Sequence, residues 1–261
     1  MTQIHLANSP IVYYKCTCNS TQWVLFLHAA FVDHSMFRHQ IAYFQNKFNL
    51  IAVDILGHGA SIHAQKGDRM GHMSGWLEQI LVSEHIDKIH VLGISLGSVL
   101  AQDFANHFPH RIQSLACFGG YDINNFDTTL QKGNNSAQIK MMAKAICSIK
   151  WFAEDNKKIS AYTEKAQQEF YEINKKFQRK SFIYLSDLNK MVNVHKPQKR
   201  DYPLLIGCGE HDIPMELTAV RMWKDSEADC RLIIFKDAGH CVNMDVPNRF
   251  NEELEAFWRQ S

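Results

Sequence analysis

The sequence predicts an α/β fold built on a doubly wound, mostly parallel sheet with one helical insertion. Three observations support this fold class. Short apolar runs of strand length alternate with amphipathic helical patterns, a strand–turn–helix segment carries Ser95 at its tip, and the alternation stops over residues 123–200 before it resumes. Continuous apolar runs are typical of parallel strands, because helices cover both faces of such a sheet. In these sheets, ligands bind beyond the carboxyl ends of the strands.

Five apolar runs in the first half of the chain have the length of buried strands. They are Ile11–Thr17, Trp23–Leu27, Leu50–Val53, Ile89–Leu92 and Ile112–Phe118. Between these runs, Ser35 is expected to cap a helix that carries Phe37 and Phe44 on its apolar face. A second helix is expected over Met73–Leu81, where apolar residues recur on one face.

The alternation stops after Asp122, and the residues that follow are polar with helical spacing. We therefore expect residues 123–200 to form a helical lid inserted in a core of residues 1–122 and 201–261. The basic run Lys196–Arg200 is expected to be a solvated linker back to that core. The sheet then resumes with strands at Pro203–Cys208 and Arg231–Phe235, a helix from about Met215 and a last helix opened by Pro247.

Length and charge limit the class of protein. With 261 residues, of which 46% are hydrophobic, the chain is long enough for one large domain with an insertion. Its formal net charge of +1 argues against nucleic acid or an anionic membrane surface as a partner, so a small-molecule substrate is expected. The longest apolar run, Trp23–Val32, is interrupted by His28 and is too short to span a bilayer.

The opening residues show no basic segment followed by an apolar one, so we expect no secretory signal and a cytoplasmic protein. The seven cysteines are an odd number, and several lie in strand-like runs, which favours reduced core thiols. Cys16 and Cys18 would lie on the same face of a strand, but their spacing is poor for zinc. We expect neither a metal site nor a cofactor. The oligomeric state stays open, a homodimer included.

The segment around Ser95 predicts an exposed nucleophile. Gly93–Gly97, read as Gly-Ile-Ser-Leu-Gly, follows an apolar strand and precedes a run with helical spacing. Such a tight turn strains the serine backbone and needs residues without bulk at both glycine positions. It raises the hydroxyl above the sheet and directs the Leu96 N–H and the helix N-terminus at the group that the hydroxyl attacks.

Later strand ends supply Asp212 and His240, so serine, acid and histidine occur in that order along the chain. With this order the sequence resembles the α/β-hydrolase superfamily, in its lid-bearing serine hydrolase or carboxylesterase-like branch. The resemblance covers nearly the whole chain except the lid, and it implies an eight-stranded sheet. The matching pieces are the His28 loop, Asp54–Ser61, the Ser95 turn, Gly209–Asp212, and Gly239-His240 with Pro247 and Phe250.

The resemblance implies a catalytic triad. Ser95 would be the nucleophile, and His240 would take its proton and later give it to the leaving group. Asp212 would hold the imidazole in the correct tautomer and stabilise the imidazolium. Asp122 is a rival acid, because some members of the superfamily place theirs after the strand that follows the nucleophile. Asp212 could instead cap the helix that begins near Ile213.

The oxyanion would lie between the N–H groups of Leu96 and Ala30. Here the chain departs from the family, which usually has His-Gly where this sequence has His28-Ala29. An alanine needs an ordinary backbone conformation, so we expect a differently shaped loop. The loop also lacks the Gly-Gly-Gly run of the hormone-sensitive-lipase type and the Gly-Gly-Pro-Gly run of proline iminopeptidases, which argues against both.

Other polar residues at strand ends are expected to be structural. His28 and His58 would hydrogen-bond loop backbone, and Asp54 and Ser61 would fix the loop that they flank. His211, beside the acid, could serve either purpose. The expected substrate-pocket residues are Phe31, Met142, Ile146 and Trp151. The last three belong to the insertion, where packing within the lid is the alternative to lining the pocket.

Together these residues predict a serine hydrolase that cleaves small carboxylic esters or related acyl compounds through an acyl-enzyme. A carbon–carbon bond hydrolase or a thioesterase with the same triad is the alternative among enzymes. A non-catalytic ligand receptor on the same fold is the alternative of another class. Serine rather than aspartate at position 95 argues against haloalkane dehalogenase and epoxide hydrolase chemistry.

Overall fold

The computed structural model describes residues 1–125, 144–145, 147–186, 188, 191, 195, 199–227 and 229–261. Eight strands form one sheet in the order β1-β2-β4-β3-β5-β6-β7-β8. The pairs β1–β2 and β2–β4 are antiparallel and all later neighbours are parallel, which confirms the predicted fold class. The strands are β1 (Thr2–His5), β2 (Val12–Cys16), β3 (Trp23–Leu27), β4 (Asn49–Asp54), β5 (Ile89–Ile94), β6 (Ile112–Phe118), β7 (Leu204–Gly209) and β8 (Arg231–Phe235).

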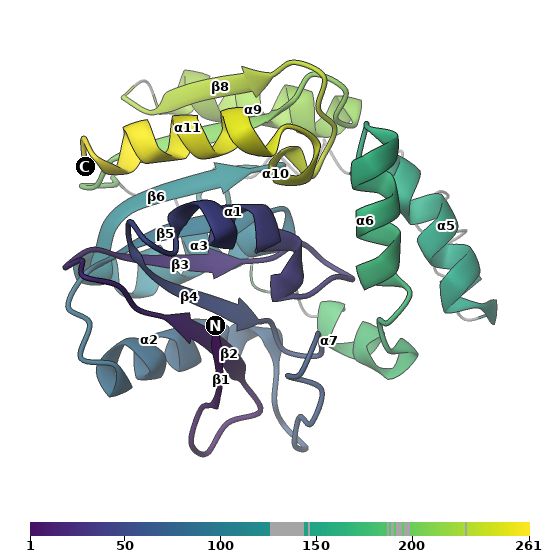
Figure 1. Ribbon diagram of the computed structural model, residues 1–261, viewed down its shortest axis with the longest axis horizontal. Coiled ribbons are helices and arrows are strands. Elements are labelled where there is room, and N and C mark those ends of the chain that lie inside the picture. The colour runs from purple at the N-terminus through teal and green to yellow at the C-terminus, as the bar shows by residue number, and fades with distance from the viewer. Residues whose placement is uncertain are drawn as a thin grey trace.

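Helices cover both faces of this sheet (Figure 1). One face packs against α2 (Met73–Ser83), α3 (Leu96–His107) and α9 (Pro214–Ser226), and the other against α1 (Arg38–Phe44), α10 (Val242–Asp245) and α11 (Pro247–Trp258). Short 3₁₀ turns precede or follow several of them, namely η1 (His34–Phe37), η2 (Met70–His72) and η3 (Pro109–Arg111). The two apolar layers leave the carboxyl ends of the strands as the place for a site.

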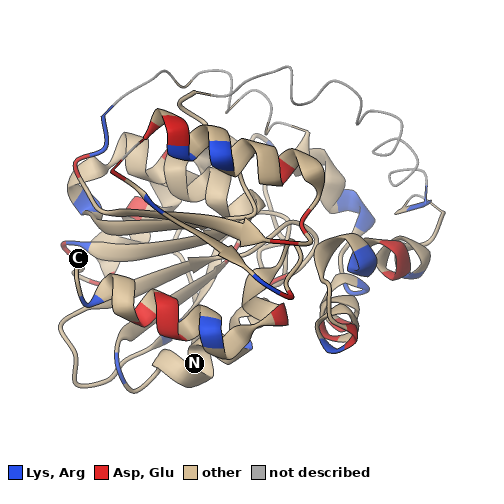
Figure 2. Ribbon diagram, turned by 90° about the horizontal axis from the view of Figure 1, so that it is seen from above, with Lys and Arg blue, Asp and Glu red and all other residues tan. Residues whose placement is uncertain are grey.

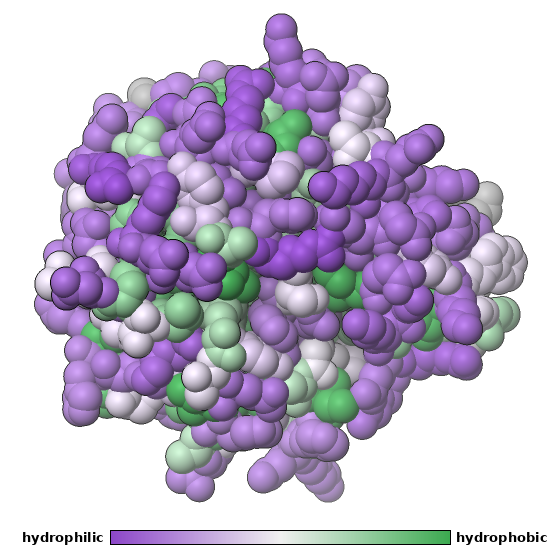
Figure 3. All heavy atoms as spheres, in the orientation of Figure 1, coloured by the Kyte–Doolittle hydropathy of each residue, from purple (hydrophilic) through white to green (hydrophobic). Residues whose placement is uncertain are grey.

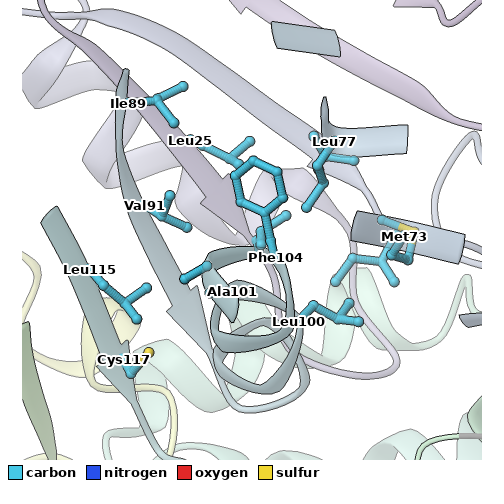
Figure 4. Close-up of a cluster of buried hydrophobic side chains, with 14 of the residues drawn as sticks. Leu25, Met73, Leu77, Ile89, Val91, Leu100, Ala101, Phe104, Leu115 and Cys117 are labelled. Carbon is cyan, nitrogen blue, oxygen red and sulfur yellow. The ribbon is translucent and has the colours of Figure 1, made fainter. Parts of the chain in front are cut away.

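The strands are buried because their side chains alternate between two apolar clusters. In β3, Leu25 faces α2 and α3, whereas Phe26 faces α1 and α11. Figure 4 shows the first cluster, in which Phe104 and Ala101 of α3 lie against Leu25 and neighbouring strand residues. This packing holds α3, which begins directly after the Ser95 turn, against the sheet.

A second group of helices lies beyond the strand ends. Between β6 and β7 the chain forms α5 (Ile149–Ser160), α6 (Glu164–Asn174), η5 (Arg179–Ser181) and α7 (Phe182–Leu185), which we call the inserted helices. Figure 1 shows them at the right of the sheet, next to the carboxyl ends of the parallel strands. Chain that leaves the core after β6 therefore returns over the edge where the predicted catalytic residues lie.

Three sequence-based expectations need correction. Strand β1 was not expected, because Thr2–His5 is a mostly exposed edge strand without an apolar run. Asp33, not Ser35, caps the helical turn η1, since its carboxylate accepts a hydrogen bond from the Ser35 N–H. Arg200 is not part of a solvated linker, because its side chain is only 3% exposed in an ion pair with Asp122.

Figure 2 shows acidic and basic residues interspersed along the helices and loops, and hydrophilic side chains prevail on the face shown in Figure 3. None of the helices described is both long and apolar enough to cross a membrane. All seven cysteines are free, and four of them, Cys117, Cys208, Cys230 and Cys241, are buried.

Candidate active site

Ser95 lies at a strained turn between β5 and α3. Its φ of 54° and ψ of −114° lie in a region that residues with a side chain rarely adopt. The turn is held because the Ser95 N–H donates to the Phe118 carbonyl of β6 at 2.8 Å. Gly93 and Gly97 are required on each side: a Cβ on Gly97 would lie 2.5 Å from the Leu27 carbonyl carbon, and one on Gly93 would lie 2.6 Å from Ser98 N. The strand–turn–helix geometry is the one that the sequence predicts.

The position of this turn gives Ser95 a favourable electrostatic environment. It is the N-cap residue of α3, whose first N–H groups have no partner within the helix. Those groups and the helix dipole concentrate positive potential around the serine. The N–H of Leu96, the first residue of the helix, is therefore placed to stabilise a negatively charged oxygen next to the Ser95 hydroxyl.

His240 and Asp212 meet above the neighbouring strand ends. Asp212 follows β7 and His240 follows β8. The two loops can touch because Gly209, at the end of β7, has no side chain: a Cβ there would overlap the carbonyl oxygens of Ala238 and Gly239. The His240 Nδ1–H donates to Asp212 Oδ1 at 2.9 Å, and Asp212 is 5% exposed. This bond leaves Nε2 as the imidazole nitrogen that can accept a proton.

The His240 ring lies beside the Ser95 turn. A Cβ on Gly119 would be 3.0 Å from His240 Cε1, and Gly119 directly follows Phe118, which binds the Ser95 N–H. Among the described residues, the Ser95 hydroxyl has no hydrogen-bond partner in this state. Long serine–histidine distances are common in enzymes without a bound substrate and shorten in the complex.

Burial and two acidic groups decide which protonation state His240 adopts. Burial by itself would lower the pKa of His240, but the charge of Asp212, its hydrogen bond and the more distant Glu216 raise that pKa to about 9. Below this pH the imidazole carries the proton and cannot act as a base. Any reaction that needs a neutral His240 is therefore expected to become faster toward alkaline pH.

The rival acid Asp122 has other partners. Its carboxylate accepts from Arg200 Nη2 at 2.6 Å and from the Asn124 N–H at 3.0 Å. Arg200 also pairs with Glu227, and all these side chains are largely buried. Nor does Asp212 cap α9: the N-cap is Ile213, whose N–H is bound by Asp212 Oδ1 at 2.7 Å. The structure thus pairs His240 with Asp212 and assigns Asp122 to a structural ion pair.

The loop after β3 carries Ala30, the second expected oxyanion donor. Its N–H makes no hydrogen bond to any other described residue. Ala29 has an ordinary backbone conformation, as an alanine requires, and the left-handed conformation falls on Phe31 instead, with a φ of 68°. In this loop the strained backbone therefore lies at Phe31.

Phe31 is held in that conformation by the inserted helices. Its ring contacts those of Phe152, Phe177 and Phe182, with centroids 5.0, 5.3 and 5.5 Å away. Asn174 of α6 donates to the Phe31 carbonyl at 3.0 Å. The loop after β3 and the inserted helices therefore pack against each other.

Of the expected pocket residues, Phe31 lines a cavity, but neither Ser95 nor His240 lines the same cavity. Phe31 borders a cavity of about 290 Å³ that also contacts Asp33, His34, Asp54 and Phe177. Trp151 does not border this cavity: its side chain on α5 is half exposed, and Lys144 lies over its ring. Met142 and Ile146 lie outside the described residues.

The remaining polar residues of the motifs hold loops. The His28 Nε2 accepts from the Ile55 N–H at 3.0 Å, and His58 Nδ1 lies 3.1 Å from the Leu56 carbonyl. Burial lowers the pKa of His58 to about 3, so this residue stays neutral. Asp54 binds the Ala60 N–H and the Ser61 hydroxyl binds the Asp54 carbonyl, as expected for loop-fixing residues.

Asp245, which sequence reasoning missed, joins the His240 loop to the inserted helices. Its carboxylate accepts from the N–H groups of Gly239, Tyr162 and Thr163 at 2.7–3.1 Å, and from the Thr163 hydroxyl at 2.9 Å. Nearby, Tyr162 stacks on the ring of His211 at 3.8 Å. Nothing in the local sequence marks Asp245, because an acidic residue before a helix is commonly a surface residue.

A second missed residue is Glu216 in the first turn of α9. It is 6% exposed, and its Oε2 is enclosed without a hydrogen-bond partner among the described residues. The helical periodicity of α9 could have signalled it, since Glu216 lies on the same side as the buried Ala219, Val220 and Trp223.

Comparisons with known proteins support the α/β-hydrolase fold. A family model described as alpha/beta hydrolase fold matches residues 22–139. Among curated proteins, 3-oxoadipate enol-lactonase 2 of Acinetobacter baylyi is 24% identical over 91% of this chain and 88% of its own, and an uncharacterized carboxylesterase of Bacillus subtilis is 21% identical over 90% and 78%. Among solved structures, a thermophilic esterase from Thermogutta terrifontis aligns with a TM-score of 0.78 and 15% identity, covering 99% of this chain and 98% of that one.

Proposed function

Since the chain belongs to the α/β-hydrolase superfamily, we propose that it is a serine hydrolase that cleaves small carboxylic esters or related acyl compounds through an acyl-enzyme. One observation carries the proposal: Ser95 stands at a strained turn on the N-terminus of α3, beside an imidazole that is already bound to a buried carboxylate. A turn that merely packed would need neither the strained serine nor the His240–Asp212 pair.

In the first half-reaction, Ser95 Oγ attacks the carbonyl carbon of the ester while His240 Nε2 takes the hydroxyl proton. The carbonyl oxygen becomes an oxyanion, which the N–H groups of Leu96 and Ala30 stabilise. One such donor is worth roughly 3 kcal/mol of transition-state free energy. His240 then gives its proton to the departing alkoxide, the ester C–O bond breaks, and the acyl group remains on Ser95.

In the second half-reaction, a water molecule gives a proton to His240 Nε2 and attacks the acyl carbon. The resulting oxyanion occupies the same two N–H groups. When the bond to Ser95 Oγ breaks, the proton returns to that oxygen, and the carboxylic acid leaves. Asp212 keeps its bond to Nδ1 throughout and so stabilises the imidazolium in both halves.

The activities in the names of the relatives support an ester as the substrate. They are an enol-lactonase, a carboxylesterase and an esterase, and a lactone is a cyclic ester whose alcohol stays attached after cleavage. In this proposal the inserted helices act as a lid, and the aromatic group around Phe31 contributes apolar contacts near the acyl group.

The test is hydrolysis of p-nitrophenyl acetate and p-nitrophenyl butyrate, with Ser95→Ala and Ser98→Ala as a matched pair. Ser98 lies one turn further along α3, and its buried hydroxyl has no partner among the described residues, so its loss should change little. Activity should disappear in the first variant and persist in the second. Turnover that survives Ser95→Ala would sink the proposal.

Labelling separates the other classes. A fluorophosphonate should modify Ser95, as seen by peptide mass spectrometry, and a non-catalytic receptor would stay unlabelled. A labelled protein that is inactive on esters and lactones but cleaves thioesters or vinylogous diketones would instead be a thioesterase or a carbon–carbon bond hydrolase with the same triad.

A further inference from the structure

A chain of buried polar side chains runs through the two longest inserted helices, which lie side by side (Figure 1). Ser160 and Asn156 belong to α5 and Asn174 ends α6, and their exposed fractions are 6%, 5% and 0%. The Asn156 amide donates to Asn174 Oδ1 at 3.0 Å, and the Ser160 hydroxyl lies 3.5 Å from Asn156 Oδ1. Buried polar groups are costly unless they are hydrogen-bonded, and apolar residues would suffice to pack two helices. The positions of these three side chains therefore need a reason beyond the packing of α5 on α6.

Each end of this chain reaches a loop of the core. At one end, Asn174 Nδ2 donates to the Phe31 carbonyl in the loop after β3 at 3.0 Å. At the other end, the Ser160 carbonyl accepts from the N–H of Cys241, in the loop after β8, at 2.7 Å. The Asn174 oxygen is occupied by the Asn156 amide, so the nitrogen is the atom that faces Phe31. The bond from Asn174 to Phe31 is thus a directed contact between α6 and the loop after β3.

Two held carbonyls flank the Ala30 N–H. His28 Nε2 accepts a backbone N–H from the loop after β4 at 3.0 Å, so Nδ1 carries the proton and donates to the Ala29 carbonyl at 2.7 Å. That carbonyl belongs to the same peptide as the Ala30 N–H, and in a trans peptide the two point in opposite directions. Phe31 follows directly, and Asn174 holds its carbonyl. The direction of the Ala30 N–H therefore depends on one bond from the core and one bond from α6.

The bond from Asn174 matters because Phe31 has a left-handed backbone, with a φ of 68°. Residues with a side chain disfavour this conformation, which persists only where the surroundings hold it. Contacts with Phe152, Phe177 and Phe182 hold the ring, but they do not fix the direction of the carbonyl. Among the described residues, the Asn174 amide is the hydrogen-bond donor to this carbonyl. Without that donor, the backbone of the loop after β3 is expected to relax.

We propose that Asn174 is a positioning residue for the oxyanion donor: by holding the Phe31 carbonyl, it keeps the Ala30 N–H directed at the oxygen that becomes negatively charged. The inference rests on the proposed serine hydrolase function. A donor that is in place before the reaction stabilises the oxyanion without rearranging, whereas the carbonyl oxygen of the bound ester carries little charge. Loss of the Asn174 amide is therefore expected to lower kcat and to leave KM nearly unchanged. The inserted helices would then contribute to the chemistry as well as to substrate binding.

The test compares p-nitrophenyl acetate hydrolysis by the wild type, Asn174→Leu and Asn251→Leu. Leucine keeps the branched shape of asparagine and removes the donor. Asn251 of α11 is also a buried asparagine, 2% exposed, but its Oδ1 accepts from Gln40 at 2.9 Å, so its loss controls for a missing buried amide. In Asn174→Leu, kcat should fall about 10- to 100-fold at nearly constant KM, as expected for a misplaced donor. Asn251→Leu should also lower the melting temperature but keep kcat and KM close to the wild-type values.

A transition-state analogue gives a second readout. Ser95 Oγ adds to the carbonyl carbon of trifluoroacetone and its proton passes to His240, so the adduct carries an oxyanion between the same two N–H groups. The inhibition constant should rise in Asn174→Leu by the factor by which kcat/KM falls, and it should not change in Asn251→Leu. Competition against fluorophosphonate labelling measures this constant even if the natural substrate is not an ester.

A merely structural role for Asn174 predicts other results. An unchanged inhibition constant, a wild-type kcat in Asn174→Leu, or an equal loss of kcat in Asn251→Leu would each overturn the proposal. If Asn174→Leu fails to fold, as judged by thermal unfolding, Asn174→Ala removes the donor with a smaller side chain and should show the same loss of kcat. Failure of the proposed function looks different, because a wild type that neither hydrolyses esters nor reacts with a fluorophosphonate would refute the hydrolase itself, and the role of Asn174 with it.

Discussion

Replacing Gly97 with alanine should disturb the Ser95 turn more than any other single methyl group. The new Cβ would overlap the Leu27 carbonyl oxygen and would lie 2.5 Å from its carbon and 2.9 Å from the His28 carbonyl oxygen. Ordinary carbon contacts are about 3.5–4.0 Å, so α3 and β3 must separate by about 1 Å. All three atoms belong to the backbone, which cannot rotate away as a side chain can. We expect a loss of about 3 kcal/mol of unfolding free energy, at the upper end for overpacking.

Gly75→Ala is the matched control. Gly75 lies on the exposed side of α2, and a Cβ there meets nothing within 4 Å. Alanine restricts the unfolded chain and suits a helix, so this variant should gain roughly 0.4–1 kcal/mol. Thermal unfolding should separate the two, with Gly97→Ala lower than the wild type by roughly 6–10 °C.

The same displacement should affect catalysis. A movement of about 1 Å at the start of α3 carries Ser95 and the Leu96 N–H away from the attacked carbonyl, and misplacement on this scale costs about 100-fold in rate. The assay is p-nitrophenyl acetate hydrolysis at a temperature where the variant is folded. If Gly97→Ala melted with the wild type and kept its kcat, the close contact between α3 and β3 would not be what holds the turn.

Four further predictions follow from the charged groups of the site. The wild-type kcat/KM should rise about tenfold per pH unit and level off near pH 9, because His240 must lose a proton to act as a base. Since the pKa of His240 is raised on folding, its stabilising effect is complete below pH 6.5 and is lost as the pH rises through about 9, which urea titrations across that window should show as falling stability. Asp212→Asn should lower kcat about 10⁴-fold. Asp122→Asn should leave kcat nearly unchanged but cost about 2 kcal/mol of unfolding free energy in urea, because Arg200 loses one of its two partners. The reverse pattern would make Asp122 the acid. Asp245→Ala should cost about 2–4 kcal/mol, since four donors lose a carboxylate acceptor, and unchanged stability would show that water replaces it.

Much of the sheet could be predicted because its signal is local. Strands such as β3 and β7 are buried on both faces, so nearly every residue in them is apolar and the run is visible without knowledge of its neighbours. The turn at Ser95 is visible for the same reason, since two glycines and a serine are contiguous. Strand β1 escaped because it is a mostly exposed edge strand, and exposed strands carry no apolar run.

The parts of the site that escaped prediction depend on contacts between distant segments. Phe31 has a left-handed backbone that its own residue type disfavours, and three aromatic rings more than 100 residues away hold it there. Glu216 and Arg200 are charged residues of types that are usually exposed, and only the folded structure shows that they are buried. The order of Asp212 and His240 along the chain indicated a pair, but their hydrogen bond required coordinates.

Four donors bind the Asp245 carboxylate. Through them, the position of the His240 loop depends on the position of the inserted helices, and the reverse. This carboxylate accepts hydrogen bonds from residues 162 and 163, between α5 and α6, and from the peptide next to His240. If residues 162 and 163 move outward, either the His240 loop moves with them or the hydrogen bonds to Asp245 break. In an enzyme of this construction, His240 would be less well positioned while the substrate enters. Full reactivity would return only when residues 162 and 163 move back over the bound molecule.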